Sequence, residues 1–135
     1  MINHFRVRCG SACIAAALAI AAGTLAATSA EAAEGVYEIS SVPAILGTPG
    51  CYVVTRNLSI SAPATYAIHV TASDVTIDLN GFTLKGDSYS IGSGILQALG
   101  ADRLTVRNGF ITGVGHPVMA ERKGNRLEDL TVVWQ

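Results

Sequence analysis

Cysteine is scarce in this sequence and is almost confined to its beginning. Of the three Cys in 135 residues, Cys9 and Cys13 precede the remainder of the chain, which holds only Cys51. If the first segment is removed, one Cys cannot form a disulfide within the chain, and the class of small exported domains held by several disulfides is excluded. Beside its Pro-Gly turn, Cys51 is expected to be a buried or half-buried small hydrophobic residue rather than a reactive thiol.

Helical periodicity is also lacking after residue 32, as are the motifs of several classes of site. Proline and glycine interrupt the stretch VPAILGTPG, so it has room for about one helical turn at most. The chain contains no phosphate-binding glycine loop, no zinc-ligand spacing and no nucleophile elbow. We therefore predict no cofactor and no metal site.

The first 32 residues have the order of a secretory signal peptide. Arg6 and Arg8 precede an uncharged stretch rich in Ala and Leu, residues 11–27, and small residues follow at Ala30 and Ala32. We predict a helical signal peptide over residues 1–32 and a secreted or periplasmic location. An uncleaved membrane anchor is the alternative, because the apolar stretch is close to the shortest that spans a bilayer.

The net charge of the predicted mature chain is slightly negative. Cleavage removes Arg6, Arg8 and Glu31 from nine basic and ten acidic residues, which leaves seven and nine and a formal charge of −2. This balance gives no reason to expect nucleic acid or an anionic membrane surface as a partner.

The mature chain is predicted to be all-β. Its apolar residues recur at every second position in short runs rich in Val, Ile, Thr and Phe, bounded by Gly, Asn, Asp or Ser. These runs are YVVTRNLSI, AIHV, VTIDL, FTL, GIL, LTV, FIT and LTVV.

Two Asn-Gly pairs stand between such runs, and each by itself indicates the tip of a β-hairpin. However, their flanks also recur, since DVTIDLNGFTLKG aligns with RLTVRNGFITGVG. Thr76 then matches Thr105 at a spacing of 29 residues, and a third copy places Thr131 a further 26 residues on. A period in the twenties with like residues at like positions is typical of a parallel β-coil, in which each rung stacks on the last, and not of a hairpin meander.

We therefore predict a β-solenoid of about three rungs over residues 51–135, preceded by an N-terminal cap segment over residues 33–50. Inward-facing positions are assigned by strand alternation. They are Ile68, Val70, Val75, Ile77, Leu79, Ile95, Leu104, Val106, Val118, Leu130 and Val132, with Phe82, Leu84, Phe110 and Ile111 on the third strand.

The outward positions of the second strand are Thr76, Thr105 and Thr131. Asp78 and Arg107 also point outward there, one rung apart, so we predict a lateral salt bridge between them at the surface.

These phrases resemble the secreted right-handed parallel β-helix proteins of the pectin-lyase-like superfamily. The resemblance rests on GCYVVTRNLSI, AIHVTASDVTIDLNGFTLKG, GIL, DRLTVRNGFITGVG and NRLEDLTV, and covers about residues 36–135. It implies a right-handed coil of three sheets. In the family, a left-handed Asn often occupies the short bend between the second and third sheets, and Asn80 and Asn108 match it. We interpret them, with Gly81 and Gly109 beside them, as a structural ladder in which Asn side chains bond from rung to rung.

The family's chemistry is not evident in this chain. In its polysaccharide lyases the substrate lies along the first sheet, beside acidic Ca²⁺ ligands and a basic residue. Here the outward positions of that sheet are His69, Leu96 and Met119, which offer no carboxylate. The paired Asp cluster of the hydrolases is also missing, and the adjacent acids Glu128 and Asp129 are interpreted as a turn or strand start.

We keep His69 as the candidate for a catalytic role, although a lone His, like His116, is usually structural. The sequence predicts an exported module of a polysaccharide-binding or polysaccharide-processing protein, itself without a recognisable active site. If the full-length protein is an enzyme, the resemblance implies a carbohydrate lyase, hydrolase or epimerase.

Two alternatives stay open. One is a non-enzymatic structural or adhesive module that uses the outer Thr face, and the other is a periplasmic metal-handling protein that uses His69, His116 and Met119. The chain stops at LTVVWQ, inside a repeat. We therefore expect a product truncated at its C-terminus, with end-to-end self-association through the open rung as the alternative.

Overall fold

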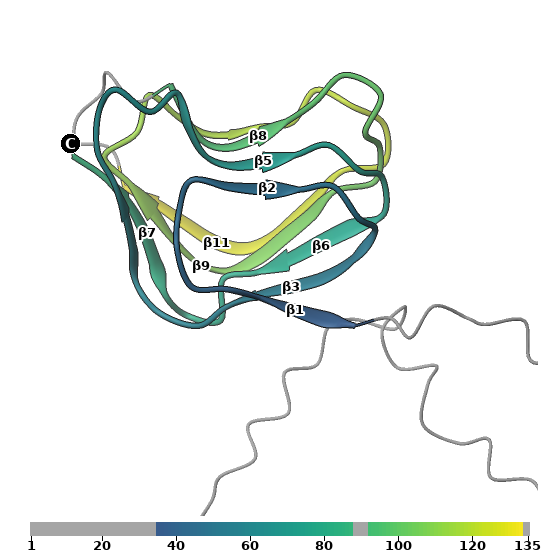
Figure 1. The fold of residues 1–135 in the computed structure, drawn as a ribbon, viewed down its shortest axis with the longest axis horizontal. Helices are drawn as coiled ribbons and strands as arrows, with labels where there is room; N and C mark the ends of the chain where they lie inside the picture. Colours follow the sequence, from purple (N-terminus) through teal and green to yellow (C-terminus); the bar gives the residue numbers. More distant parts are fainter. Residues whose placement is uncertain (1–34, 88–91, 134–135) are drawn as a thin grey trace, which may run out of the picture.

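Short parallel strands wind into a coil whose two sheets face each other (Figure 1). The computed structural model describes residues 35–87 and 92–133. The strands there are β1 (Val36–Ile39), β2 (Ala44–Leu46), β3 (Gly50–Val54), β4 (Leu58–Ile60), β5 (Tyr66–Val70), β6 (Val75–Asp78), β7 (Thr83–Gly86), β8 (Ser93–Gln97), β9 (Thr105–Thr112), β10 (His116–Met119) and β11 (Arg126–Val133). The predicted signal peptide, residues 1–32, lies outside the described residues, and no helix in the described part is long and apolar enough to cross a membrane.

The strand pairing confirms the coil and excludes hairpins at the Asn-Gly pairs. One sheet has the order β10-β8-β5-β2, and the other has the order β1-β3-β6-β9-β7-β4, with β11 paired to β9. All the strand pairings found among the described residues are parallel.

The described coil has about four rungs, so the prediction of about three is wrong. The first rung consists of β2, β3 and β4, and these strands pair with β5, β6 and β7 of the next. The alignment of the internal repeats missed this rung, because VVTRN stands where the second and third rungs have an Asn-Gly pair.

The register of the second and third rungs is as predicted, but that of the last rung is not. Thr76 pairs with Thr105, whereas Thr131 lies beside Phe110, and Arg126 takes the place beside Thr105. The phrase Leu-Thr-Val therefore follows the corner in β11 instead of preceding it. Asp129, with φ of 48°, occupies the corner position that Asn108, with φ of 60°, occupies in β9.

Left-handed residues form two corners of the coil. The corner predicted from the Asn-Gly pairs holds Asn80 (φ 53°), Asn108 and Asp129. A second corner, which the sequence analysis missed, holds Asp74 and Arg103, both with φ of 58°. Because Asn and Asp tolerate this conformation better than most residues, their recurrence lets successive rungs bend at the same place.

The buried Asp78 carboxylate links the residues of the first of these corners. It accepts hydrogen bonds from the Asn80 backbone N–H at 2.8 Å and from the Asn108 side-chain amide at 3.1 Å, and it pairs with Arg107 Nε at 3.1 Å. The predicted salt bridge is present, but it is not a surface pair, since Asp78 is 4% exposed. The side-chain amide of Asn80 donates to the Val54 carbonyl oxygen at 3.4 Å. The Asn side chains were predicted to bond to one another from rung to rung, but they bond to Asp78 and to the backbone instead.

Apolar side chains fill the space between the two sheets. The fully buried ones are Val54, Ile68, Val70, Val75, Ile77, Leu79, Leu84, Ile95, Leu104, Val106 and Ile111. Phe110 was predicted to face inward, but it is 45% exposed because Gly109 and Ile111 take the inward positions of β9. Cys51 is buried as predicted, and the structure has it disulfide-bonded rather than as an unpaired residue.

The two glycines of the Asn-Gly pairs serve different purposes. Gly81 has φ of +77°, and a Cβ added there would meet nothing within 4 Å. A Cβ on Gly109, which lies within β9, would come 2.3 Å from Leu79 Cβ and 2.9 Å from the Phe82 carbonyl oxygen. Gly81 is therefore needed for its conformation, and Gly109 for its lack of a side chain.

This difference predicts different responses to substitution. We expect Gly109→Ala to lower the free energy of unfolding by about 3 kcal/mol through overpacking, and Gly81→Ala by about 1 kcal/mol through its left-handed backbone. Asn in place of Gly81 should restore most of the loss, whereas Asn in place of Gly109 should worsen it. Urea unfolding measures all four variants, and an equal response at the two sites would contradict the assignment.

An exposed ion pair links the rungs at the Asp74 corner. Arg103 Nε and Asp74 Oδ1 are 2.5 Å apart, and the hydrogen bond from Arg103 lowers the pKa of the Asp74 carboxyl below its usual value. Such a group adds stability above its unfolded pKa, and the contribution is lost as the pH falls through the folded pKa. Because both side chains are more than half exposed, the effect is small.

Asp74→Asn, which keeps a residue tolerant of the left-handed backbone, should therefore be less stable than the wild type at pH 7. The difference should shrink as the pH falls below the usual pKa of an Asp carboxyl and through the lowered pKa that Asp74 has in the folded protein. Arg103→Gln should show the same convergence. Urea unfolding at pH 7 and pH 3 tests this, and a difference that grows in acid would refute it.

Candidate functional site

A row of mainly apolar side chains runs across the outward face of sheet β10-β8-β5-β2. The strand register places Ile45 beside His69, His69 beside Leu96, and Leu96 beside Met119. Ile45 is 64% exposed and the other three are half-buried. The row agrees with the outward positions predicted for this sheet, and β2 extends it by one residue.

His69 is the polar member of this row. Its imidazole contacts the Tyr66 ring, with the ring centres 4.9 Å apart and the planes inclined by 46°. In the part of the chain that the structure describes, no three His, Cys, Asp or Glu side chains lie close enough together to hold a metal ion. The site therefore presents His69 as part of an aromatic and apolar surface.

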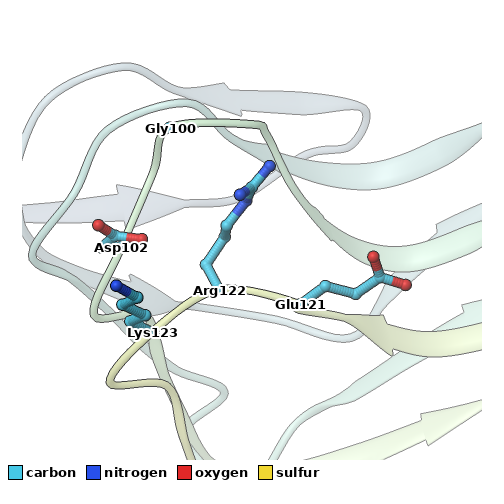
Figure 2. Close-up of a pocket in the computed structure, with 5 residues that line it drawn as sticks. All are labelled: Gly100, Asp102, Glu121, Arg122 and Lys123. Atoms are coloured by element: carbon cyan, nitrogen blue, oxygen red, sulfur yellow. The ribbon is translucent and has the colours of Figure 1, made fainter.

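A shallow hollow of about 540 Å³ covers part of the row. It is lined by His69, Leu96, Gln97, Ala98, Leu99, Met119, Glu121 and Arg122. A second hollow of about 460 Å³ is lined by Gly100, Asp102, Glu121, Arg122 and Lys123 (Figure 2). Because both include Glu121 and Arg122, the two hollows adjoin and form one candidate site with an apolar half and a charged half.

The charged half combines two acids with two bases. In Figure 2, Arg122 extends toward the segment at Gly100, with Glu121 on one side and Asp102 and Lys123 on the other. Over residues 35–87 and 92–133, the ion pairs join Asp74 to Arg103, Asp78 to Arg107 and Glu128 to Arg126, so none of these four side chains takes part in one. The charge of Asp102 acts on the neighbouring Arg103 guanidinium, and the other three charges have no ion-pair partner among the described residues.

Asn125 closes the loop that carries three of these charges. Its amide nitrogen donates to the Ala120 carbonyl oxygen at 3.2 Å, which ties the two ends of segment 120–125 together. The same side chain exchanges hydrogen bonds with the amide of Gln97, at 2.7 and 2.9 Å, and Gln97 is only 8% exposed. Asn125 Oδ1 also accepts from the Leu104 N–H at 2.9 Å. We call this group of bonds the Asn125 clasp.

The backbone holds the same loop against the neighbouring rung. The Arg103 N–H donates to the Lys123 carbonyl oxygen at 2.9 Å. Gly124 has φ of +72°, and a Cβ there would come 2.9 Å from Arg103 Cγ, so both conformation and space require glycine. The loop is therefore anchored on β8 and on the Asp74 corner.

The other residues singled out in the sequence lie away from this site. His116 is exposed on β10 beside Ser93 and lines neither hollow. Glu128 is beside Arg107 on β11, with Asp129 at the corner. The Asn-Gly ladder residues Asn80, Gly81, Asn108 and Gly109 are also absent from both linings.

Sequence reasoning found part of the site and missed the rest. It identified His69, Leu96 and Met119, but not Glu121, Arg122, Lys123 or the Asn125 clasp. The clasp joins residues 28 positions apart, and their contact follows from the rung length. The one local signal was the Gly-Asn pair at residues 124–125, which is typical of a turn.

Comparison with known proteins adds no relative to this description. The chain has no significant match among protein-family models, curated proteins or solved structures. The parallel solenoid and its site are thus the basis for the functional argument.

Removal of the clasp should loosen the loop. Asn125→Ala leaves Gln97 and the Leu104 N–H without their partners, so we expect the free energy of unfolding to fall by about 3 kcal/mol. Asn57→Ala is the matched control, because Asn57 accepts one bond, from the Thr83 N–H at 3.0 Å, at an exposed position. It should cost about 1 kcal/mol.

Thermal unfolding and hydrogen exchange at the Leu104 amide measure the effect of the clasp. The Asn125→Ala variant should exchange this proton faster, and the Asn57→Ala variant should not. Unchanged protection in Asn125→Ala would show that the clasp does not hold the loop.

Proposed function

We propose that this chain is a module of an exported right-handed β-helix protein, and that it binds polysaccharide on the outward face of sheet β10-β8-β5-β2. The observation that carries the proposal is the row Ile45, His69, Leu96 and Met119, which runs from rung to rung and opens into a hollow with a charged rim.

This surface has the properties that a sugar chain requires. Sugar rings have apolar faces that can pack on apolar and aromatic side chains, while their hydroxyl groups need polar partners at the edge. Leu96, Met119 and the His69–Tyr66 ring pair provide the first kind of contact. Glu121 and Arg122 provide the second. Since neighbouring rungs are about 4.8 Å apart, the four side chains of the row can contact an extended polymer over about 14 Å.

The two alternative functions receive less support from the same geometry. An adhesive Thr face would need Thr131 beside Thr105, but Arg126 lies there instead. A metal site would need His69 and Met119 together, but the register places Leu96 between them.

Binding to a panel of immobilised polysaccharides tests the proposal. Leu96→Asp places a charge on the row and should weaken binding at least tenfold. Thr105→Asp is the matched control, because Thr105 is a half-buried strand residue that lines neither hollow. It should bind as the wild type does.

Two results would contradict the proposal. One is that no polysaccharide in a panel of neutral, anionic, cationic and zwitterionic chains retains the wild-type protein. The other is that Thr105→Asp weakens binding as much as Leu96→Asp does.

A further inference from the structure

The charged half of the site is balanced in sign, and this balance bears on the kind of polysaccharide it accepts. Asp102 and Glu121 supply two negative charges, and Arg122 and Lys123 supply two positive ones around one hollow. We infer that the site selects a zwitterionic polysaccharide, one whose repeat carries both a carboxylate or phosphate group and an amino group. This inference rests on the proposed function and names the ligand class of the same site.

The signs of the charges around the hollow decide which polymers it attracts. A polyanion is attracted by Arg122 and Lys123 but repelled by Asp102 and Glu121, and a polycation meets the reverse, so neither gains much over a neutral chain. A ligand that carries both signs can place each group against the opposite charge. We therefore expect the hollow to bind a chain that carries both charges more tightly than a chain with a high density of either one.

The arrangement of these side chains favours the same class of ligand. Arg122 lies between Glu121 on one side and Asp102 with Lys123 on the other (Figure 2). Arg122 and Glu121 also line the apolar hollow beside Leu96 and Met119. A sugar packed on those two side chains can direct an anionic substituent to the Arg122 guanidinium and a neighbouring amino group to Glu121.

The loop that carries three of these charges is held in place before a ligand binds. The Asn125 clasp and the bond from Arg103 to Lys123 fix the backbone of segment 120–125. A fixed loop loses less conformational freedom on binding, so more of the attraction between charges appears as affinity. Exposed ion pairs contribute little because solvent screens them and their long side chains must be ordered, so a fixed backbone removes one further cost of binding.

The experiment compares four chains by titration calorimetry at mildly acidic pH, where amino groups are protonated. They are neutral dextran, anionic polygalacturonate, cationic chitosan and carboxymethyl chitosan, which carries both charges. The wild-type protein should bind carboxymethyl chitosan at least tenfold more tightly than each of the others.

Substitutions then show which side chain binds the anionic group of the ligand and which binds its amino group. Arg122→Gln should remove the advantage of carboxymethyl chitosan over chitosan, and Glu121→Gln should remove its advantage over polygalacturonate. Lys85→Gln is the control, since Lys85 is an exposed cation on β7, outside both hollows. It should leave the order of the four ligands unchanged.

The possible results separate this inference from the proposed function. If none of the four chains binds, the proposed function fails along with the inference. If dextran, polygalacturonate or chitosan binds as tightly as carboxymethyl chitosan, or if both Gln variants keep the wild-type order, the inference is overturned and polysaccharide binding stands.

Discussion

The left-handed bends at two corners are the constraint on which the rest of this structure depends. Parallel rungs stack in register only if each rung bends at the same place, and in the later rungs the bend uses a backbone conformation that most residues disfavour. Asn80, Asn108 and Asp129 provide it at one corner, with Asp78 as a buried acceptor for two of them. Asp74 and Arg103 provide it at the other. The core follows, because a fixed corner fixes which side chains face inward.

The candidate site is a consequence of the same geometry. Segment 120–125 lies against the Asp74 corner, where the Lys123 carbonyl oxygen accepts from the Arg103 N–H. The Asn125 clasp holds the backbone of this segment, and the segment's Glu121 and Arg122 side chains lie beside the apolar row on sheet β10-β8-β5-β2. Stacking thus produces two complementary surfaces next to each other, one from strand alternation and one from an anchored loop. The polysaccharide binding proposed above uses both surfaces.

Local patterns in the sequence predicted the features that repeat. Alternation identified Ile68, Ile77 and Ile95 as core, and repetition paired Thr76 with Thr105. The same reasoning misplaced Thr131, because Leu-Thr-Val recurs on opposite sides of the corner in β9 and β11. It also missed Arg122 and the Asn125 clasp, since these depend on a contact between residues in different rungs. Where a side chain recurs in successive rungs, the sequence itself shows which residues lie next to each other. Where a side chain occurs in one rung, its neighbours are known only when the register of the strands is known.

The register of the last rung is the most direct test of this account. In a background with all three native Cys changed to Ser, Thr105→Cys combined with Arg126→Cys puts two Cys on neighbouring strands at about the 4.8 Å strand spacing, within disulfide range. We predict rapid cross-linking of this pair under mild oxidation, and none for Thr105→Cys with Thr131→Cys. Mass spectrometry of the proteolytic fragments reads the outcome. Preferential cross-linking of the Thr105 and Thr131 pair would contradict both the register and the corner at Asp129.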